Sequence, residues 1–165
     1  MQFAKDSFYI ALRDRLAALN PGRTVVVDGR MRPAVLVAEN EPANAAPPLP
    51  NAFYLSWGAP AFVKGTESAR RPLMKMECSI GYRIAGAQPG AVDRGRALAA
   101  LDTELLRLTT PPRTPKRDHA HTSPVELGSS VFWALPEFGD AEIAHEERRR
   151  RARLLIFFFP EVDQA

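Results

Sequence analysis

The clearest pattern of apolar and polar positions lies between Met74 and Ile84, where the chain reads MKMECSIGYRI. From Met74 onward every second residue is apolar, and the residues between them are charged, polar or glycine. A period of two predicts a strand with one face in the core and the other toward solvent. Cys78 lies on the apolar face, so we expect it to be a small buried hydrophobe rather than a reactive thiol.

Two longer stretches repeat with the period of an amphipathic helix. The first runs from Ala4 to Leu19 and is ended by Asn-Pro-Gly, which suits a helix C-terminus. The second runs from Ala91 to Leu108 and is ended by two prolines. Their apolar stripes are Phe8, Leu12, Leu16 and Leu19 in the first helix, and Ala97, Leu98, Leu101, Leu105 and Leu108 in the second.

Short apolar runs bounded by turn residues predict further strands. A tight-turn pair, Asp28-Gly29, separates two of them and indicates a hairpin with Pro33 at its edge or start. Two proline-rich segments, 39–51 and 111–124, are expected to be irregular and extended, and 58–72 and 137–147 are expected to be loops. The predicted short strands are Thr24–Val27, Arg32–Ala38, Ala52–Trp57 and Ser130–Leu135.

The final strand, Arg153 to Phe159, differs from the others because it is apolar at both parities. A strand that is exposed on one face would alternate, so both faces are expected to be covered. Two helices can cover one face of a small sheet, and either a second subunit or a long loop would cover the other. An uncovered run of this kind would be prone to aggregation. Phe158 is therefore a candidate contact with a second subunit.

The order of elements predicts an α+β fold with a mainly antiparallel sheet, two helices packed on one face, and proline-rich loops or arms. A length of 165 residues favours a single domain over 1–165. The single cysteine excludes a disulfide framework and a cysteine-rich zinc site. No apolar run is long enough to span a membrane, and the N-terminus is too charged for a signal peptide. We expect a protein that stays in the cytosol where it is made.

The sequence contains no recognisable catalytic motif. Glycine-rich phosphate loops and the GxSxG, HExxH and CxxC patterns are all missing. His119 and His121 follow Asp118 and could share an ion on an extended segment, but a solvated polar loop is the more common use of such residues. We therefore expect no enzyme, no cofactor and no metal site, although spacing alone does not exclude a site assembled from distant residues.

The sharpest charged feature is the arginine run that leads into the final strand. Alternate arginines of a strand project to opposite faces, with Glu146 and Glu147 near enough to pair with them. Three uses stay open: a solvated hairpin, salt bridges between subunits, and contact with nucleic-acid phosphates. A net charge of +3 is small for a dedicated nucleic-acid binder. The candidate contacts with a second subunit are Arg148, Arg149, Arg150, Arg151, Arg153 and Phe158.

A leading helix, the long strand MKMECSIGYRI, the helix GRALAALDTELLRL and a hairpin of VFWAL and RLLIFFF occur in this order. This arrangement resembles the tail terminator and tail-completion proteins of long-tailed bacteriophages and related phage-like particles. The resemblance covers most of the chain outside the proline-rich segments. It implies an α+β domain with a structural role, without a cofactor or a reaction.

The resemblance further implies a homo-oligomeric ring, commonly a hexamer, at the head-proximal end of the tail tube. Such a ring stops tube growth and joins the tail to the head connector. The implied partners are other copies of the chain, the tail tube protein and the head–tail connector protein, with nucleic acid only passing through a lumen and no membrane. Assembly would take place in the host cytoplasm, and the protein would end in the virion tail. The alternative is a nucleic-acid-binding module that uses the run from Arg148 to Arg153.

Overall fold

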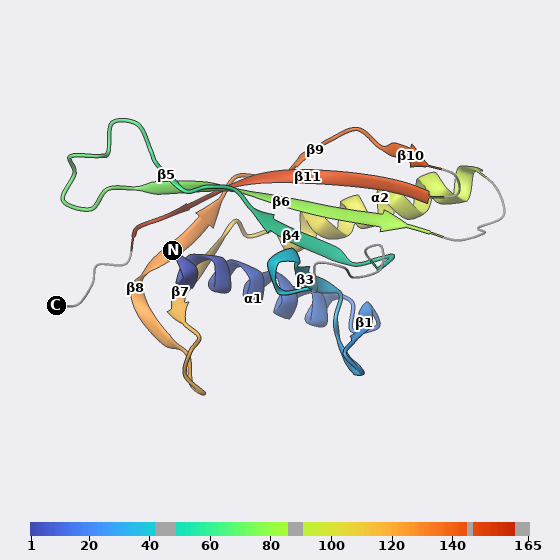
Figure 1. The fold of residues 1–165 in the computed structure, drawn as a ribbon, viewed down its shortest axis with the longest axis horizontal. Helices are drawn as coiled ribbons and strands as arrows, with labels where there is room; N and C mark the ends of the chain where they lie inside the picture. The colour runs from blue at the N-terminus through green and yellow to red at the C-terminus, as the bar shows by residue number, and fades with distance from the viewer. Residues whose placement is uncertain (42–48, 86–90, 145–146, 161–165) are drawn as a thin grey trace.

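The computed structural model describes residues 1–41, 49–85, 91–144 and 147–160. Two helices pack against a large sheet, and a small two-stranded sheet lies beside them (Figure 1). The helices are α1 (Gln2–Leu19) and α2 (Ala91–Leu108), with a short 3-10 helix η1 (Ala38–Asn40). The strands are β1 (Thr24–Val27), β2 (Arg30–Pro33), β3 (Val35–Val37), β4 (Phe53–Trp57), β5 (Ala61–Phe62), β6 (Met74–Ile84), β7 (Arg113–Asp118), β8 (Val125–Trp133), β9 (Glu137–Phe138), β10 (Glu142–Ala144) and β11 (Glu147–Phe158).

The large sheet is built around the pairing of β6 with β11, in the strand order β3-β4-β6-β11-β8-β7. The two strands are antiparallel and stay in register from Arg148 opposite Ile84 to Phe158 opposite Met74. The short strands β9 and β10 also pair with β11, and β5 pairs with β6. All pairs in the described residues are antiparallel except β3 with β4, which is parallel.

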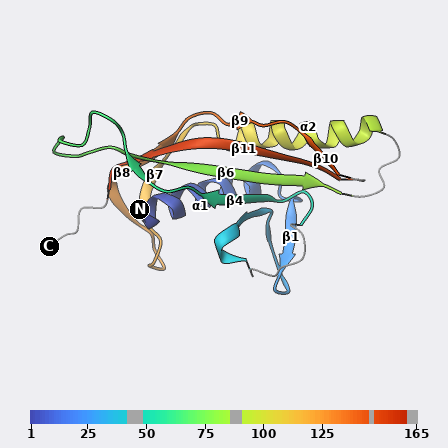
Figure 2. The same cartoon turned by 45° about the horizontal axis from the view of Figure 1, so that its top comes forward.

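Both helices cover the same face of this sheet, which confirms the predicted α+β class (Figure 2). The apolar residues at alternate positions from Met74 are all buried in β6, as the period of two predicts, and Arg83 on the other face is buried as well. From α1, the Phe8 ring meets the rings of Trp57 and Trp133 edge to face, at centroid distances of 5.8 and 4.9 Å. From α2, Leu98, Leu101, Leu105 and Leu108 complete the same core.

The hairpin of β1 and β2 confirms the turn that Asp28-Gly29 predicts. Asp28 has a φ of 50° and Gly29 a φ of 72°, so both turn residues adopt the left-handed conformation that a type I′ turn needs. Pro33 is the last residue of β2, where it pairs with Thr24. The predicted strand Arg32–Ala38 is thus divided between the end of this hairpin and β3 in the large sheet.

The prediction of an irregular segment over 111–124 is wrong, because it contains the strand β7. Arg113 to Asp118 pairs with β8, and a register shift occurs between Pro115 and Arg117. The segment is held from both sides: the Ser7 hydroxyl of α1 accepts a hydrogen bond from the Arg117 amide, and Lys116 donates to the Phe159 carbonyl. Since β7 is an edge strand, Pro115 removes no hydrogen bond from a central ladder.

Other boundaries also differ from the prediction. β8 begins at Val125, β9 and β10 occupy part of the expected loop 137–147, and β5 occupies part of 58–72. β11 begins at Glu147, so the whole arginine run belongs to the strand. Within the expected irregular segment 39–51, η1 forms the start, and residues 42–48 lie outside the described residues.

Among the described residues, only one face of the final strand is covered. Phe158 is fully buried on the helix-covered face, opposite Met74, so its prediction as a contact with a second subunit is wrong. Leu155 is 41% exposed on the opposite face, and Phe157 is partly exposed there. No segment of the described residues lies over Leu155 as the expected covering loop would.

We predict that Phe158→Ala lowers the free energy of unfolding by about 3–5 kcal/mol, because it leaves a large cavity in the core. Leu155→Ala on the same strand should lower it by no more than about 1 kcal/mol, because that side chain is already partly in water. Urea unfolding of both variants measures the difference. Equal losses would contradict the assignment of the two faces.

We also predict that the folded protein resists alkylation by iodoacetamide. Burial raises the pKa of the Cys78 thiol well above its usual range, so little thiolate exists at about pH 8. The thiol should react readily once the chain is unfolded in urea. Mass spectrometry of the alkylated protein, with and without urea, checks this, and rapid alkylation of the folded chain would contradict the burial of Cys78.

Candidate interface on the open sheet face

The arginine run is divided between the two faces of the sheet, as the alternation of a strand predicts. Arg148 and Arg150 are on the face that the helices cover, in register with Ile84 and Tyr82. Arg149, Arg151 and Arg153 are on the opposite face, in register with Arg83, Gly81 and Ser79. We call this second face the open face, because no described helix packs on it.

Arg150 belongs to a polar network that joins the sheet to α2. Its Nε lies 3.1 Å from Oδ1 of Asp102, and its guanidinium also donates to the Gly139 carbonyl. The Tyr82 hydroxyl donates to the same Asp102 oxygen at 2.5 Å. Burial of Tyr82, together with this hydrogen bond, raises the pKa of its hydroxyl above the usual range. These contacts lie within one chain, so Arg150 stabilises the fold rather than offering a free contact.

On the open face, Arg83 and Arg149 lie directly opposite each other on β6 and β11. Like charges in this position repel, and Glu147 compensates both. Its carboxylate lies 2.7 Å from a guanidinium nitrogen of Arg83 and 2.7 Å from one of Arg149. The expected pairing of the run with a neighbouring glutamate is therefore confirmed for Glu147, whereas Glu146 lies outside the described residues.

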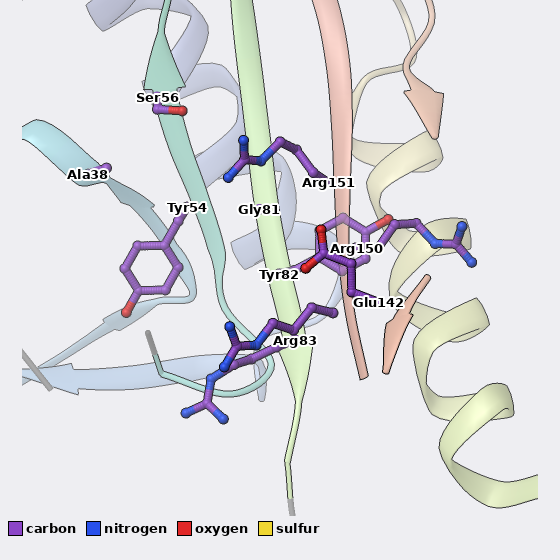
Figure 3. Close-up of a pocket in the computed structure, with 10 residues that line it drawn as sticks. Ala38, Tyr54, Ser56, Gly81, Tyr82, Arg83, Glu142, Arg150 and Arg151 are labelled. Carbon is purple, nitrogen blue, oxygen red and sulfur yellow. The ribbon is translucent and has the colours of Figure 1, made fainter. Parts of the chain in front are cut away.

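A hollow of about 430 Å³ opens beside these arginines, between β4, β6 and β11 (Figure 3). Gly81 forms part of its floor, with Tyr54 opposite it on β4 and Arg151 opposite it on β11. A side-chain carbon placed on Gly81 would meet nothing within 4 Å. Because glycine has no side chain, the space above Gly81 stays open, and Ser56, Glu142, Arg83 and Arg149 are among the other residues that line it.

The other end of the open face is apolar. Phe157 of β11 stacks on Phe132 of β8, with ring centroids 5.8 Å apart and planes inclined by 12°. Leu155 lies between this aromatic pair and Arg153 along the same strand face. The open face therefore combines a basic end, around Arg149 and Arg151, with an apolar end, around Leu155 and Phe157.

Sequence reasoning found only part of this surface. Arg149, Arg151 and Arg153 were expected as contacts and lie on it, whereas Arg148 and Arg150 lie on the helix-covered face. Gly81 and Arg83 were missed as site residues, although the period of two places both on the polar face of β6. Their position beside Arg151 and Arg149 depends on the register between two strands far apart in the chain, which no local pattern contains.

His119 and His121 directly follow the strand β7, which ends at Asp118. His121 is exposed, with its Nε2 3.6 Å from a carboxylate oxygen of Asp118. Within the described residues, no group of three or more histidine, cysteine, aspartate or glutamate side chains is arranged to hold a metal ion. Neither α1 nor the described α2 is long and apolar enough to cross a membrane.

Comparison with known proteins finds similarity to chains of solved structures. No family model matches the chain, and no curated protein matches it either. A chain of a solved structure, described as the virion of a native gene transfer agent (GTA) particle, is 18% identical to it with a TM-score of 0.40. The aligned region covers 94% of each chain. At this TM-score the likeness assigns neither a fold nor a function.

We predict that the two faces of the arginine run differ in their effect on stability. Arg150→Ala should lower the free energy of unfolding by about 1–3 kcal/mol, because Asp102 and the Gly139 carbonyl lose a charged donor. Arg149→Ala should change it by about 0.5 kcal/mol or less, since its ion pair is exposed. Urea unfolding measures both, and the reverse order would contradict the register of β11.

Proposed function

We propose that this protein is a structural component of a phage-like particle and acts as a tail terminator. In this proposal, copies of the chain form a ring, most simply a hexamer, at the head-proximal end of the tail tube. The ring stops tube growth and joins the tail to the head connector. Its partners are other copies, the tube protein and the connector protein. It assembles in the host cytoplasm, ends in the virion tail, and carries out no reaction.

The observation that carries this proposal is the open face of the sheet. Leu155 is 41% exposed at one end of this face, and the stacked rings of Phe157 and Phe132 are partly exposed beside it, while two helices cover the other face of the sheet. Aromatic residues and arginine are enriched where protein surfaces meet, and both occur on this face. Covering it with a second protein removes apolar surface from water, which stabilises association.

The order and arrangement of the elements give further support. A leading helix, a long alternating strand, a second helix and a final hairpin follow one another as in the terminator family that the sequence resembles. The two ends of the sheet, β3 and β7, also present different edges. Contacts between unlike surfaces repeat around a closed ring, whereas contacts between like surfaces end at a dimer.

A nucleic-acid-binding module is the second candidate. It is favoured by the four arginines that line one hollow, which are Arg83, Arg149, Arg150 and Arg151. Binding through phosphate contacts would weaken steeply between low and physiological salt. Fluorescence anisotropy with labelled single-stranded and duplex DNA at low salt tests this candidate, and a lack of binding there would exclude it.

Native mass spectrometry of the purified protein, alone and with tail tube, tests the terminator proposal. We expect a discrete closed oligomer, either in the free protein or when tube is added. A protein that stays monomeric in both conditions would overturn the proposal. A monomer that carries co-purified nucleic acid would favour the second candidate.

We predict that Leu155→Glu prevents this assembly while the monomer stays folded. A carboxylate at this position places a charge in the apolar end of the open face, where association would bury it without a partner. Met31→Glu is the matched control, because Met31 is 72% exposed on the β1–β2 hairpin, away from the open face. Circular dichroism checks folding and native mass spectrometry the oligomer. Normal assembly of Leu155→Glu would exclude this face as the interface.

A further inference from the structure

We propose that the hollow over Gly81 binds a carboxylate side chain of a neighbouring protein chain, with Arg151 as its main ligand. This inference rests on the proposed assembly function, because it assigns a specific contact to the basic end of the open face. It concerns the space between β4, β6 and β11 that no side chain of the described residues fills.

The shape of the hollow allows a side chain to enter it. Tyr54, Gly81 and Arg151 form one row across three adjacent strands, and glycine stands at the middle of the row. Figure 3 shows the guanidinium of Arg151 reaching over β6 toward β4. The Tyr54 ring is held by its hydroxyl, which accepts a hydrogen bond from the Leu49 amide at 2.9 Å. A fixed aromatic wall and an open glycine floor leave room for a side chain to enter.

The arginines around the hollow differ in how their charges are paired. Arg83 and Arg149 both pair with Glu147, as described above. The side chain of Arg151, in contrast, has no hydrogen bond or ion pair to any of the described residues, although its backbone carbonyl accepts a hydrogen bond from the Gly139 amide. Glu142 also lines the hollow, in register with Arg149. The arginines beside β11 are therefore largely compensated within the chain, and Arg151 is the cation left to pair with a group from outside.

The surroundings of Arg151 also decide which kind of anion fits the hollow. A guanidinium binds one carboxylate through two parallel hydrogen bonds, which gives both strength and a fixed orientation. A nucleic-acid backbone would extend a row of phosphates across the whole face. Four carboxylates stand on that face and would repel it: Glu77, Glu137, Glu142 and Glu147. The mixture of charges therefore favours a single carboxylate on a protein surface over a polyanion.

The direct test is an NMR titration that follows the arginine Nε–Hε signals of the full chain. The probes are a blocked hexaglutamate peptide and an oligothymidylate of equal charge. We expect hexaglutamate to shift the Arg151 signal more than the other arginine signals. Arg151→Ala should weaken binding about tenfold, because it removes charge-assisted hydrogen bonds. Arg151→Lys should restore only part of it, because a lysine keeps the charge but not the planar fork.

Arg30→Ala is the matched control, because Arg30 is exposed on the β1–β2 hairpin. If Arg30→Ala and Arg151→Ala weakened hexaglutamate binding equally, the inference would be overturned, because the binding would then reflect general attraction between charges. Binding of the oligothymidylate without binding of hexaglutamate would overturn it in favour of nucleic acid. The absence of any Arg151 shift with hexaglutamate would overturn it as well.

A second variant connects the site to assembly. Gly81→Glu would place a carboxylate in the chain's own hollow, where a side-chain carbon has free space. We expect this carboxylate to compete with that of the neighbouring chain for Arg151 and to shift the oligomer toward monomer in native mass spectrometry. Gly81→Ala should assemble normally. Assembly of Gly81→Glu equal to that of the unmodified chain would overturn the inference and leave the terminator proposal standing. A wild-type chain that stays monomeric with tube would instead overturn the terminator proposal. The NMR titration would still test whether Arg151 binds a carboxylate.

Discussion

The antiparallel pairing of β6 with β11 is the constraint on which the rest of this structure depends. The two strands stay in register from Met74 to Ile84 on one side and from Phe158 to Arg148 on the other. Because side chains alternate across a strand, this register decides the face of every residue in both strands. A slip of one residue would exchange the buried Leu154 and Ile156 with the exposed Leu155 and Arg153. The helices can pack only on the face where both strands are apolar.

The same register explains how a run of four consecutive arginines is tolerated in a central strand. Arginines on the helix side need partners within the fold, and Asp102 of α2 supplies one for Arg150. Those on the open side are spaced by carboxylates that reduce their mutual repulsion, as Glu147 does between Arg83 and Arg149. The run therefore serves two purposes: Arg150 joins the sheet to a helix, and Arg149 and Arg151 belong to the open face.

The open face connects this packing to the proposed function. Its apolar end, with Leu155 and the stacked Phe132 and Phe157, gives association a source of free energy that does not depend on direction. Its basic end, with Arg151 beside the hollow over Gly81, can select a partner, because an arginine and a carboxylate pair only in a defined geometry. An interface of this composition suits a protein whose role is to assemble with others, as the terminator proposal requires.

The sequence by itself determined the elements whose patterns are local. Period two placed β6 at Met74–Ile84, period 3.6 placed α2 at Ala91–Leu108, and Asp28-Gly29 placed the hairpin turn. Tertiary structure decided the rest. The segment Arg113–Asp118 is a strand because β8 and Ser7 offer it hydrogen bonds, against the preference of Pro115. Phe158 is a core residue and Leu155 a surface residue because the register with β6 separates them, and a run that is apolar at both parities contains no local signal for that choice.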